Sequence, residues 1–213
     1  MILLSTKDKP ERTTQLSPDS WIGAALSVLV EDGIEAVQIT ALARKLNVTR
    51  GSFYWHFEGR GDLLEALLAE WRARNSGVML DALAQSDSLE AGILDLFSVW
   101  VDHTRFDPKL DQAVRDWARR DGALSEALRE EDDARVAAIA AFFERFWYAP
   151  TEAFVRARVI YFTQLSFYAL GIDEPMQSRV GYLDAYFLCF TGRKVDASVS
   201  ETYRRMLLSG ESE

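Results

Sequence analysis

The chain has 213 residues, of which 48% are hydrophobic, and its 24 Lys and Arg against 33 Asp and Glu give a formal net charge of −9. This composition excludes wholesale disorder, and the net negative charge means that the surface as a whole repels nucleic acid and anionic membranes. The single cysteine, Cys189, excludes an intrachain disulfide and a zinc site built from thiolates. Without a run of about 20 apolar residues or a signal peptide, we expect a soluble, cytoplasmic protein with no membrane partner.

The negative charge is unevenly distributed. Residues 1–60 carry seven basic and seven acidic residues, whereas the remainder carries 17 basic and 26 acidic ones. Between Val37 and Arg60 there are four basic residues against Glu58 alone. A basic island in an acidic protein indicates one small face that meets an anion. On the charges alone, chance clustering on a solvated face is the simpler explanation.

The first predicted helix begins at Pro18, with Ser17 as its N-cap and Asp19 in its first turn. Gly33 supplies the left-handed residue that ends it. Its apolar residues recur on one face at helical spacing: Ile22, Ala25, Leu26, Leu29 and Val30.

Two shorter helices are expected to follow. Thr40 is predicted to cap a helix through Leu46, Asn47 suits a left-handed turn, and Thr49 is predicted to cap a helix from Arg50 to about His56. Two short helices joined by a tight turn form a helix-turn-helix. A seven-residue helix is about 10 Å long, which fits a DNA major groove about 12 Å wide.

The order of unlike residues in this region is distinctive: residues 38–57 read QITALARKLNVTRGSFYWHF, and Arg60 and Asp62-Leu63-Leu64 follow. This stretch resembles the DNA-binding signature of the TetR family of bacterial transcriptional regulators. Two positions depart from the family pattern. Asn47 replaces a usual glycine, which asparagine tolerates because it also adopts positive φ. Gly59-Arg60-Gly61 replaces serine-lysine-glutamate, so we expect a looser first turn in the fourth helix.

The resemblance implies that the DNA backbone is held by Thr40, Lys45, Tyr54, His56 and Arg60. It also implies that the bases are faced by Thr49, Arg50, Ser52 and Trp55. Arg50 is expected to read sequence, because a guanidinium fork matches guanine O6 and N7. The alternative for Tyr54 and Trp55 is packing against a neighbouring helix, and for His56 it is a helix C-cap.

The remaining chain reads as consecutive helices with no β pattern, so the predicted fold is all-α. We expect an N-terminal arm over 1–16, a three-helix helix-turn-helix DNA-binding head over 17–61, and a helical-bundle ligand-binding and dimerisation domain over 62–213. Lys7, Lys9 and Arg12 in the arm could reach DNA, although their acidic neighbours favour a disordered tail. One helix is predicted to begin near Pro108 and to carry Leu110, Val114 and Trp117, and further helices are predicted over 124–146, 152–170 and 176–191. The Asp111–Arg115 pair and the acidic run 130–133 are predicted to face solvent.

The last two of these helices are apolar on two sides, so each needs two packing partners. One partner is the chain's own bundle, and the other is predicted to be a second copy, which the family resemblance also implies. The alternative is that both helices are central to their own domain. The expected dimer contacts are Val155, Val159, Phe162, Leu183, Phe187 and Phe190.

An aromatic-rich bundle can leave a mostly apolar cavity with a few polar groups. The residues predicted to line it are Trp100, His103, Trp117, Phe143, Trp147, Tyr161, Gln164 and Tyr168. As a set they indicate an aromatic or amphipathic small molecule, whereas any single one is explained as simply by core packing.

No residue pattern indicates a catalytic site, a metal site or a cofactor, so we do not expect an enzyme. The sequence predicts a regulator that binds a palindromic DNA operator as a homodimer, acts as a repressor and is released by a small-molecule effector. A helical protein–protein adaptor whose helix-turn-helix does not bind DNA is the alternative. It would show no salt-dependent affinity for DNA.

Overall fold

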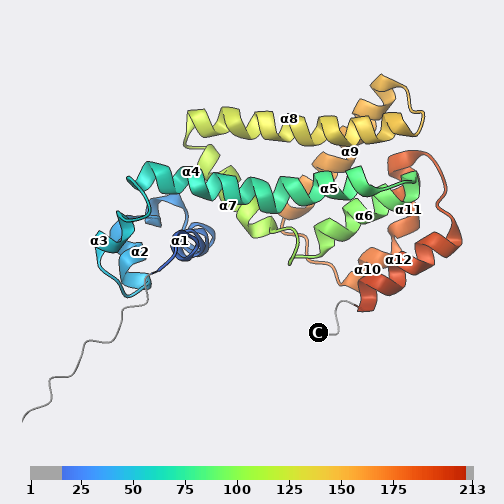
Figure 1. Ribbon diagram of the computed structural model, residues 1–213. Helices are drawn as coiled ribbons and strands as arrows, with labels where there is room; N and C mark the ends of the chain where they lie inside the picture. Colours follow the sequence, from blue (N-terminus) through green and yellow to red (C-terminus); the bar gives the residue numbers. More distant parts are fainter. Residues whose placement is uncertain (1–15, 210–213) are drawn as a thin grey trace, which may run out of the picture. The chain divides into compact units, whose positions relative to one another are not determined.

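The computed structural model describes residues 16–209, and every regular element within them is helical, which confirms the all-α prediction (Figure 1). The chain divides into two compact units between Leu67 and Leu68, whereas the sequence placed the boundary between residues 61 and 62. Residues 1–15, which include the arm residues Lys7, Lys9 and Arg12, lie outside the described range. Among residues 16–209, no helix has the length and apolar character needed to cross a membrane.

The N-terminal unit contains α1 (Pro18–Asp32), the short 3₁₀ helix η1 (Ile34–Ala36), α2 (Ile39–Lys45), α3 (Arg50–Phe53) and the start of α4 (Arg60–Trp71). The predicted ends of α1 are confirmed: Ser17 is its N-cap, and Gly33 follows it with φ 81°. Asn47 has φ 54°, as its place in the turn predicts.

Two boundaries in this unit differ from prediction. Gln38 is the N-cap of α2, so Thr40 lies inside the first turn of the helix. The third helix ends at Phe53 instead of His56, because the amides of His56 and Phe57 both donate to the Phe53 carbonyl and close a turn. The turn brings Phe57 back into the core, where it is 7% exposed.

The core of the N-terminal unit centres on Phe53. Its ring meets that of Trp21 from α1 edge to face at a centroid distance of 5.2 Å and stacks with Phe57 at 5.2 Å. Leu42 and Leu63 complete this core and, like Phe53, are inaccessible to solvent. Each short helix is therefore held by the side chains on one face, and the opposite face is left to solvent.

The C-terminal unit contains the end of α4, the π-helical segment η2 (Arg72–Gly77), α5 (Val78–Gln85), α6 (Leu89–Val101), α7 (Pro108–Ala118), α8 (Gly122–Arg145), α9 (Pro150–Ala169), α10 (Met176–Gly181), α11 (Leu183–Thr191) and α12 (Ala197–Ser209). The sequence did not predict α12, and the helix expected over 176–191 is divided at Tyr182, where ψ is −2°.

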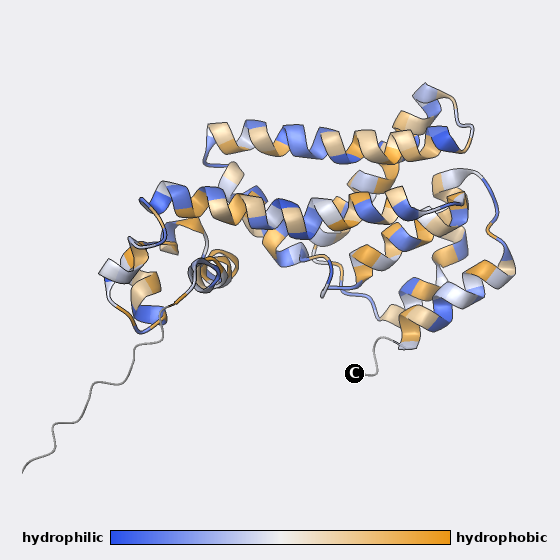
Figure 2. Ribbon diagram, in the orientation of Figure 1, coloured by the Kyte–Doolittle hydropathy of each residue, from blue (hydrophilic) through white to orange (hydrophobic). Residues whose placement is uncertain are grey.

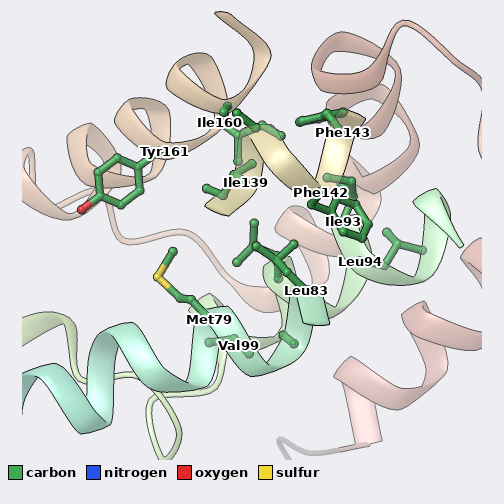
Figure 3. Packing of buried hydrophobic residues seen from close by; sticks show 14 of the residues in the cluster. Met79, Leu83, Ile93, Leu94, Val99, Ile139, Phe142, Phe143, Ile160 and Tyr161 are labelled. Carbon is green, nitrogen blue, oxygen red and sulfur yellow. The ribbon is translucent and has the colours of Figure 1, made fainter. Parts of the chain in front are cut away.

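The core of this unit is formed by α5, α6, α8, α9 and α11 (Figure 3). Met79 and Leu83 of α5 face Ile139 of α8, and Ile160 approaches from α9 (Figure 3). Gly92 lets α6 approach α8, because a Cβ atom there would lie 2.0 Å from the Cζ of Phe142.

The chain stays helical from α4 to α5, but η2 is wound as a π-helix with i→i+5 hydrogen bonds. Trp71, Asn75, Met79 and Leu83 follow one another at four-residue spacing and are all buried. In an α-helix each residue turns by about 100° around the axis, so residues four apart are rotated by about 40° relative to one another. The wider π-turn takes up that rotation and keeps one face toward the core.

A buried ionic cluster joins several segments of this unit. Asp111 of α7 is inaccessible to solvent and accepts hydrogen bonds from Trp71 Nε1 at 3.0 Å, Arg115 Nε at 2.8 Å and Arg135 Nη1 at 3.2 Å. The prediction that Asp111 and Arg115 lie on the solvent side of their helix is therefore wrong. Arg135, from the middle of α8, is 1% exposed and also donates to Ser76 Oγ at 2.8 Å.

The acidic run contributes to the same cluster. Asp132 accepts two hydrogen bonds from Arg115, at 2.7 and 2.9 Å, and one from the hydroxyl of Tyr161 at 2.6 Å. Glu131 accepts from Ser76. Figure 2 shows this hydrophilic run midway along α8. Only Glu130 and Asp133 of the run are exposed, so the prediction of a solvated face is wrong for the other two residues.

The pKa of Asp111 follows from this geometry. Burial by itself raises the pKa of the carboxyl group, but the charges of Arg115 and Arg135 and the hydrogen bonds to it outweigh burial and lower the pKa below its ordinary value. A carboxyl group with a lowered pKa in the folded state stabilises the fold above its unfolded pKa of about 4. That contribution is lost as the pH falls below this value.

We expect Asp111→Asn to lower the free energy of unfolding by about 3–5 kcal/mol, because Arg135 keeps its buried charge and loses its counter-ion. Chemical denaturation at neutral pH measures the change. Asp116→Asn, on the same helix, is the control, since Asp116 is exposed and its nearest approach to Arg119 is 3.5 Å. Equal losses of unfolding free energy in the two variants would contradict the role of Asp111 as the buried counter-ion. The same conclusion would follow if Asp111→Asn lost as much stability as the parent protein when the pH is lowered.

Candidate functional site

The surface of the N-terminal unit has a hollow between η1, α2, α3 and the start of α4. It is lined by Glu35, Gln38, Ile39, Thr40, Arg50, Tyr54 and Arg60. Four residues predicted to contact DNA, namely Thr40, Arg50, Tyr54 and Arg60, therefore lie together. Gln38 could not be predicted from the sequence, because glutamine is not a preferred N-cap residue and its amide instead donates to the Glu35 carbonyl at 3.0 Å.

The face of α3 opposite Phe53 is turned to solvent. Trp55 is 81% exposed and Tyr54 is 57% exposed. Thr49 and Arg50 are also exposed, and the hydroxyl of Thr49 makes no capping hydrogen bond although the residue is the N-cap of α3. Ser52 is half-buried. The Tyr54 ring packs edge to face on Phe53 at a centroid distance of 5.4 Å, so one edge of it is used by the core. This face therefore offers the Thr49 hydroxyl, the Arg50 guanidinium and the Trp55 ring to solvent.

Two of the predicted backbone contacts, Arg60 and Lys45, bind other groups of the protein, and a third, His56, is partly buried. Arg60 donates from Nε to the Val37 carbonyl at 2.7 Å and from Nη2 to the Ile34 carbonyl at 2.9 Å. It thereby fixes the segment before α2, and only its remaining N–H groups can meet a phosphate. Lys45 turns toward α1, where its Nζ lies 3.4 Å from Glu31 Oε2. His56 is half-buried, and its Nε2 has no hydrogen-bond partner among the described residues.

The C-terminal unit has a cavity between α6, α9, α10 and α11. It is lined by Ile93, Leu94, Phe97, Trp100, Ile160, Thr163, Gln164, Phe167, Glu174, Arg179, Leu183, Tyr186 and Phe190. Two of the residues predicted to line a ligand pocket, Trp100 and Gln164, line this cavity. Tyr168 lies behind this wall, stacked on Phe106 at 5.6 Å, and its hydroxyl donates to the Trp100 carbonyl at 2.6 Å.

The other predicted pocket residues lie elsewhere. Trp147 is 92% exposed in the turn after α8, where it has φ 71°, and His103 is exposed in the loop after α6. Phe143 and Trp117 are buried in packing contacts, and Tyr161 belongs to the ionic cluster. Aromatic residue type alone did not separate core positions from cavity positions. The lining residues that the sequence analysis missed include Arg179.

A second, open hollow of about 690 Å³ runs along the outer face of α9. We call it the α9 groove; it is lined by Phe154, Val155, Arg158, Val159, Phe162, Thr163, Ser166, Phe167, Leu170, Ile172 and Tyr186. Three predicted dimer contacts, Val155, Val159 and Phe162, line it and are 51%, 48% and 37% exposed. Leu183 and Phe187 are 2% and 1% exposed in the unit's own core, so they present no surface to a second copy. Phe190 is half-buried at the cavity.

Comparison with known proteins identifies the N-terminal unit. Residues 22–67 match the family model described as "Bacterial regulatory proteins, tetR family". Residues 22–67 are therefore a TetR-family DNA-binding domain.

Two relatives share this TetR-family domain. The chain is 48% identical over 48 residues to the HTH-type transcriptional regulator SrpR of Pseudomonas putida, a match that covers 22% of each chain. It is 38% identical over 72 residues to the class D tetracycline repressor protein of Escherichia coli, covering 34% of this chain and 33% of the repressor. Each match therefore spans well under two thirds of the relative.

The similarity in fold extends beyond the N-terminal unit. A crystal structure of a putative TetR-family transcriptional regulator from Rhodococcus sp. superposes with a TM-score of 0.57. It covers 90% of this chain and 95% of the other, at 18% identity. The superposition shows that the two chains share an all-helical fold over most of their length.

Whether the Trp55 ring lies in solvent or packs on a neighbouring helix can be decided from the stability of a truncated variant. We expect Trp55→Ala to change the free energy of unfolding by less than about 0.5 kcal/mol, because the side chain is exposed. Phe53→Ala, two residues earlier, is expected to cost about 3–5 kcal/mol because its ring fills the core. Thermal unfolding of both variants tests this difference, and a large loss for Trp55→Ala would mean that its ring packs on a neighbouring helix.

Proposed function

We propose that this protein is a sequence-specific DNA-binding transcriptional regulator that acts as a homodimeric repressor and is released from its operator by a small molecule. The observation that carries this proposal is the solvent-facing side of α3 with the exposed Arg50 and Trp55, beside an open hollow that is lined by hydroxyl and guanidinium groups and by Glu35. The all-helical C-terminal unit adds a cavity and an exposed apolar groove, which suit an effector and a second copy.

In the proposed complex, α3 enters the major groove and the hollow receives a backbone phosphate. Arg50 contacts a guanine edge, where a bidentate contact is worth about 1–3 kcal/mol of discrimination. Thr40 and Tyr54 donate hydroxyl hydrogen bonds to the phosphate, which fix the register of α3 without reading sequence. Lys45 has a smaller role than the sequence suggested, because it must leave Glu31 to reach DNA.

The α9 groove supports the proposal of a dimer. Its exposed apolar side chains cover two turns or more of α9, and single exposed apolar residues are normal whereas a contiguous patch indicates an interface. One α3 offers few base contacts, and two of them spaced about 34 Å apart would read a palindrome. A symmetric contact through the same groove on both copies would bring two such helices into one complex.

Release by an effector is proposed as a shift between two states of the C-terminal unit. The cavity and the α9 groove share Thr163, Phe167 and Tyr186, so a ligand that moves these side chains also changes the dimer contact. To lower operator affinity tenfold, the ligand must prefer the released state by about 1.4 kcal/mol.

The DNA-binding function is tested by selecting bound sequences from a random pool of duplexes and measuring affinity for the selected site and a scrambled one. We expect Arg50→Ala to reduce the preference for the selected site at least tenfold. Lys45→Ala is the matched control, since it removes a charge from α2 without touching α3 and should weaken both DNAs equally. If no sequence is enriched and binding does not depend on salt, the protein is an adaptor and not a regulator.

The dimer is tested with Val159→Asp, which places a charge in the α9 groove without disturbing the core. We expect this variant to be monomeric by light scattering, with unchanged helical content by circular dichroism. Leu80→Asp is the control, because Leu80 is an aliphatic residue on α5 that is 40% exposed and lies outside the groove. A dimeric Val159→Asp variant would place the interface elsewhere.

A further inference from the structure

Arg179 of α10 is the only arginine or lysine that lines the cavity of the C-terminal unit within the described residues. Its guanidinium lies over two aromatic rings, 4.5 Å from the centroid of Phe167 and 5.7 Å from that of Phe97. Among residues 16–209, no carboxylate oxygen lies within 4.0 Å of it, and it donates no hydrogen bond. Its N–H donors are thus held in a fixed plane and left without an acceptor.

Several other arginines of this unit that stack on aromatic rings also donate hydrogen bonds to the protein. Arg135 and Arg145, which are also stacked on aromatic rings, donate hydrogen bonds to Ser76 and to backbone carbonyls, respectively. Arg179 is half-buried, and burial lowers the pKa of its guanidinium. Placing a cation in an apolar wall without a close counter-ion is unfavourable, and an anion in the cavity would relieve that cost.

A second donor lies on the same cavity wall. The amide Nε2 of Gln164 on α9 is buried and makes no hydrogen bond within 3.5 Å among the described residues, and the side chain faces the Tyr168 hydroxyl. Glu174 also lines the cavity, but its carboxylate is not within 4.0 Å of Arg179. The rest of the lining is mainly aliphatic and aromatic, including Ile93, Ile160 and Leu183. The site therefore has a planar cation and an amide donor at an otherwise apolar wall.

We propose that the cavity binds a small organic carboxylate with an apolar body, with Arg179 holding the carboxylate and Gln164 donating a further hydrogen bond to it. The proposal rests on the effector cavity of the proposed function and names its ligand class. Arginine suits this role because its planar fork pairs with both oxygens of a carboxylate. Stacking on Phe97 and Phe167 fixes the fork in advance, which reduces the entropy lost on binding.

The size of the cavity adds a conformational requirement. Its volume is about 50 Å³, enough for one or two water molecules but not for an organic ligand. The apolar body therefore enters only when the wall opens. The short helix α10, which carries Arg179, and the rings of Phe167 and Tyr186 form much of that wall. Binding would then favour a more open state of the unit over the closed one described here.

The test uses isothermal titration calorimetry on the full chain with two carboxylates, octanoate and 4-phenylbutyrate, and their uncharged counterparts, octan-1-ol and 4-phenylbutan-1-ol. We expect at least one carboxylate to bind at least tenfold more tightly than its alcohol. Arg179→Gln should abolish this preference while the alcohol still binds, which shows that the cavity is intact. Arg119→Gln is the control, because Arg119, the residue directly after α7, has a side chain that is 76% exposed, and the variant should keep the preference.

Two further variants keep the test decisive if Arg179→Gln does not fold. Gln164→Leu should weaken the carboxylate and leave the alcohol unchanged or tighter. Glu174→Gln should leave carboxylate binding unchanged or tighter, since it removes the other negative charge from the cavity wall. Equal binding of carboxylate and alcohol by the parent, no binding of any probe, or a preference that survives Arg179→Gln would each overturn the proposal.

The test of carboxylate binding and the test of DNA binding can fail independently of each other. Operator selection does not depend on the ligand, so enrichment of a DNA site together with equal binding of carboxylate and alcohol would overturn only the ligand class. A carboxylate preference that depends on Arg179 in a protein that selects no DNA would support the ligand class and overturn the regulator.

Discussion

The buried carboxylate of Asp111 is the interaction around which the C-terminal unit is organised. It accepts hydrogen bonds from the end of α4, from its own helix α7 and from the middle of α8. Through Arg115 the cluster extends to Asp132 and to Tyr161 on α9. Because every partner is charged or polar and shielded from water, losing one group leaves another unpaired. This requirement fixes the relative positions of helices whose apolar faces alone would allow several packings.

The N-terminal unit follows a simpler constraint. Its four-residue helix α3 is held by one buried side chain, Phe53, between Trp21 and Phe57. Phe57, from the turn after α3, completes this anchor, so Arg50 and Trp55 on the other side stay exposed. The large ring of Trp55 in that turn can therefore lie in water while the helix is held from its buried side.

What could be predicted from the sequence depended on how local the signal was. The ends of α1 were predictable because the residue types at Ser17 and Gly33 favour helix ends locally. The TetR-family signature named residues for DNA contact, of which Thr49, Arg50 and Trp55 are exposed in the structure. The burial of Asp111 was not predictable, since its partners lie far along the chain, and an acid–base pair at helical spacing is ordinarily a surface feature. Phe187 and Val159 illustrate the same limit: on helices with two apolar sides, residue type does not tell which side faces the core.

The π-helical segment η2 has a consequence for comparing this protein with others. A π-turn accommodates one more residue than an α-turn over the same rise, so it behaves as a single-residue insertion inside an otherwise regular helix. A relative whose helix is regular at this point would carry one residue fewer there. An alignment without a gap between residues 72 and 77 would then equate Met79 and Leu83 with positions on a different face. Beyond this point, homologous core positions are better matched by superposed coordinates than by residue counting.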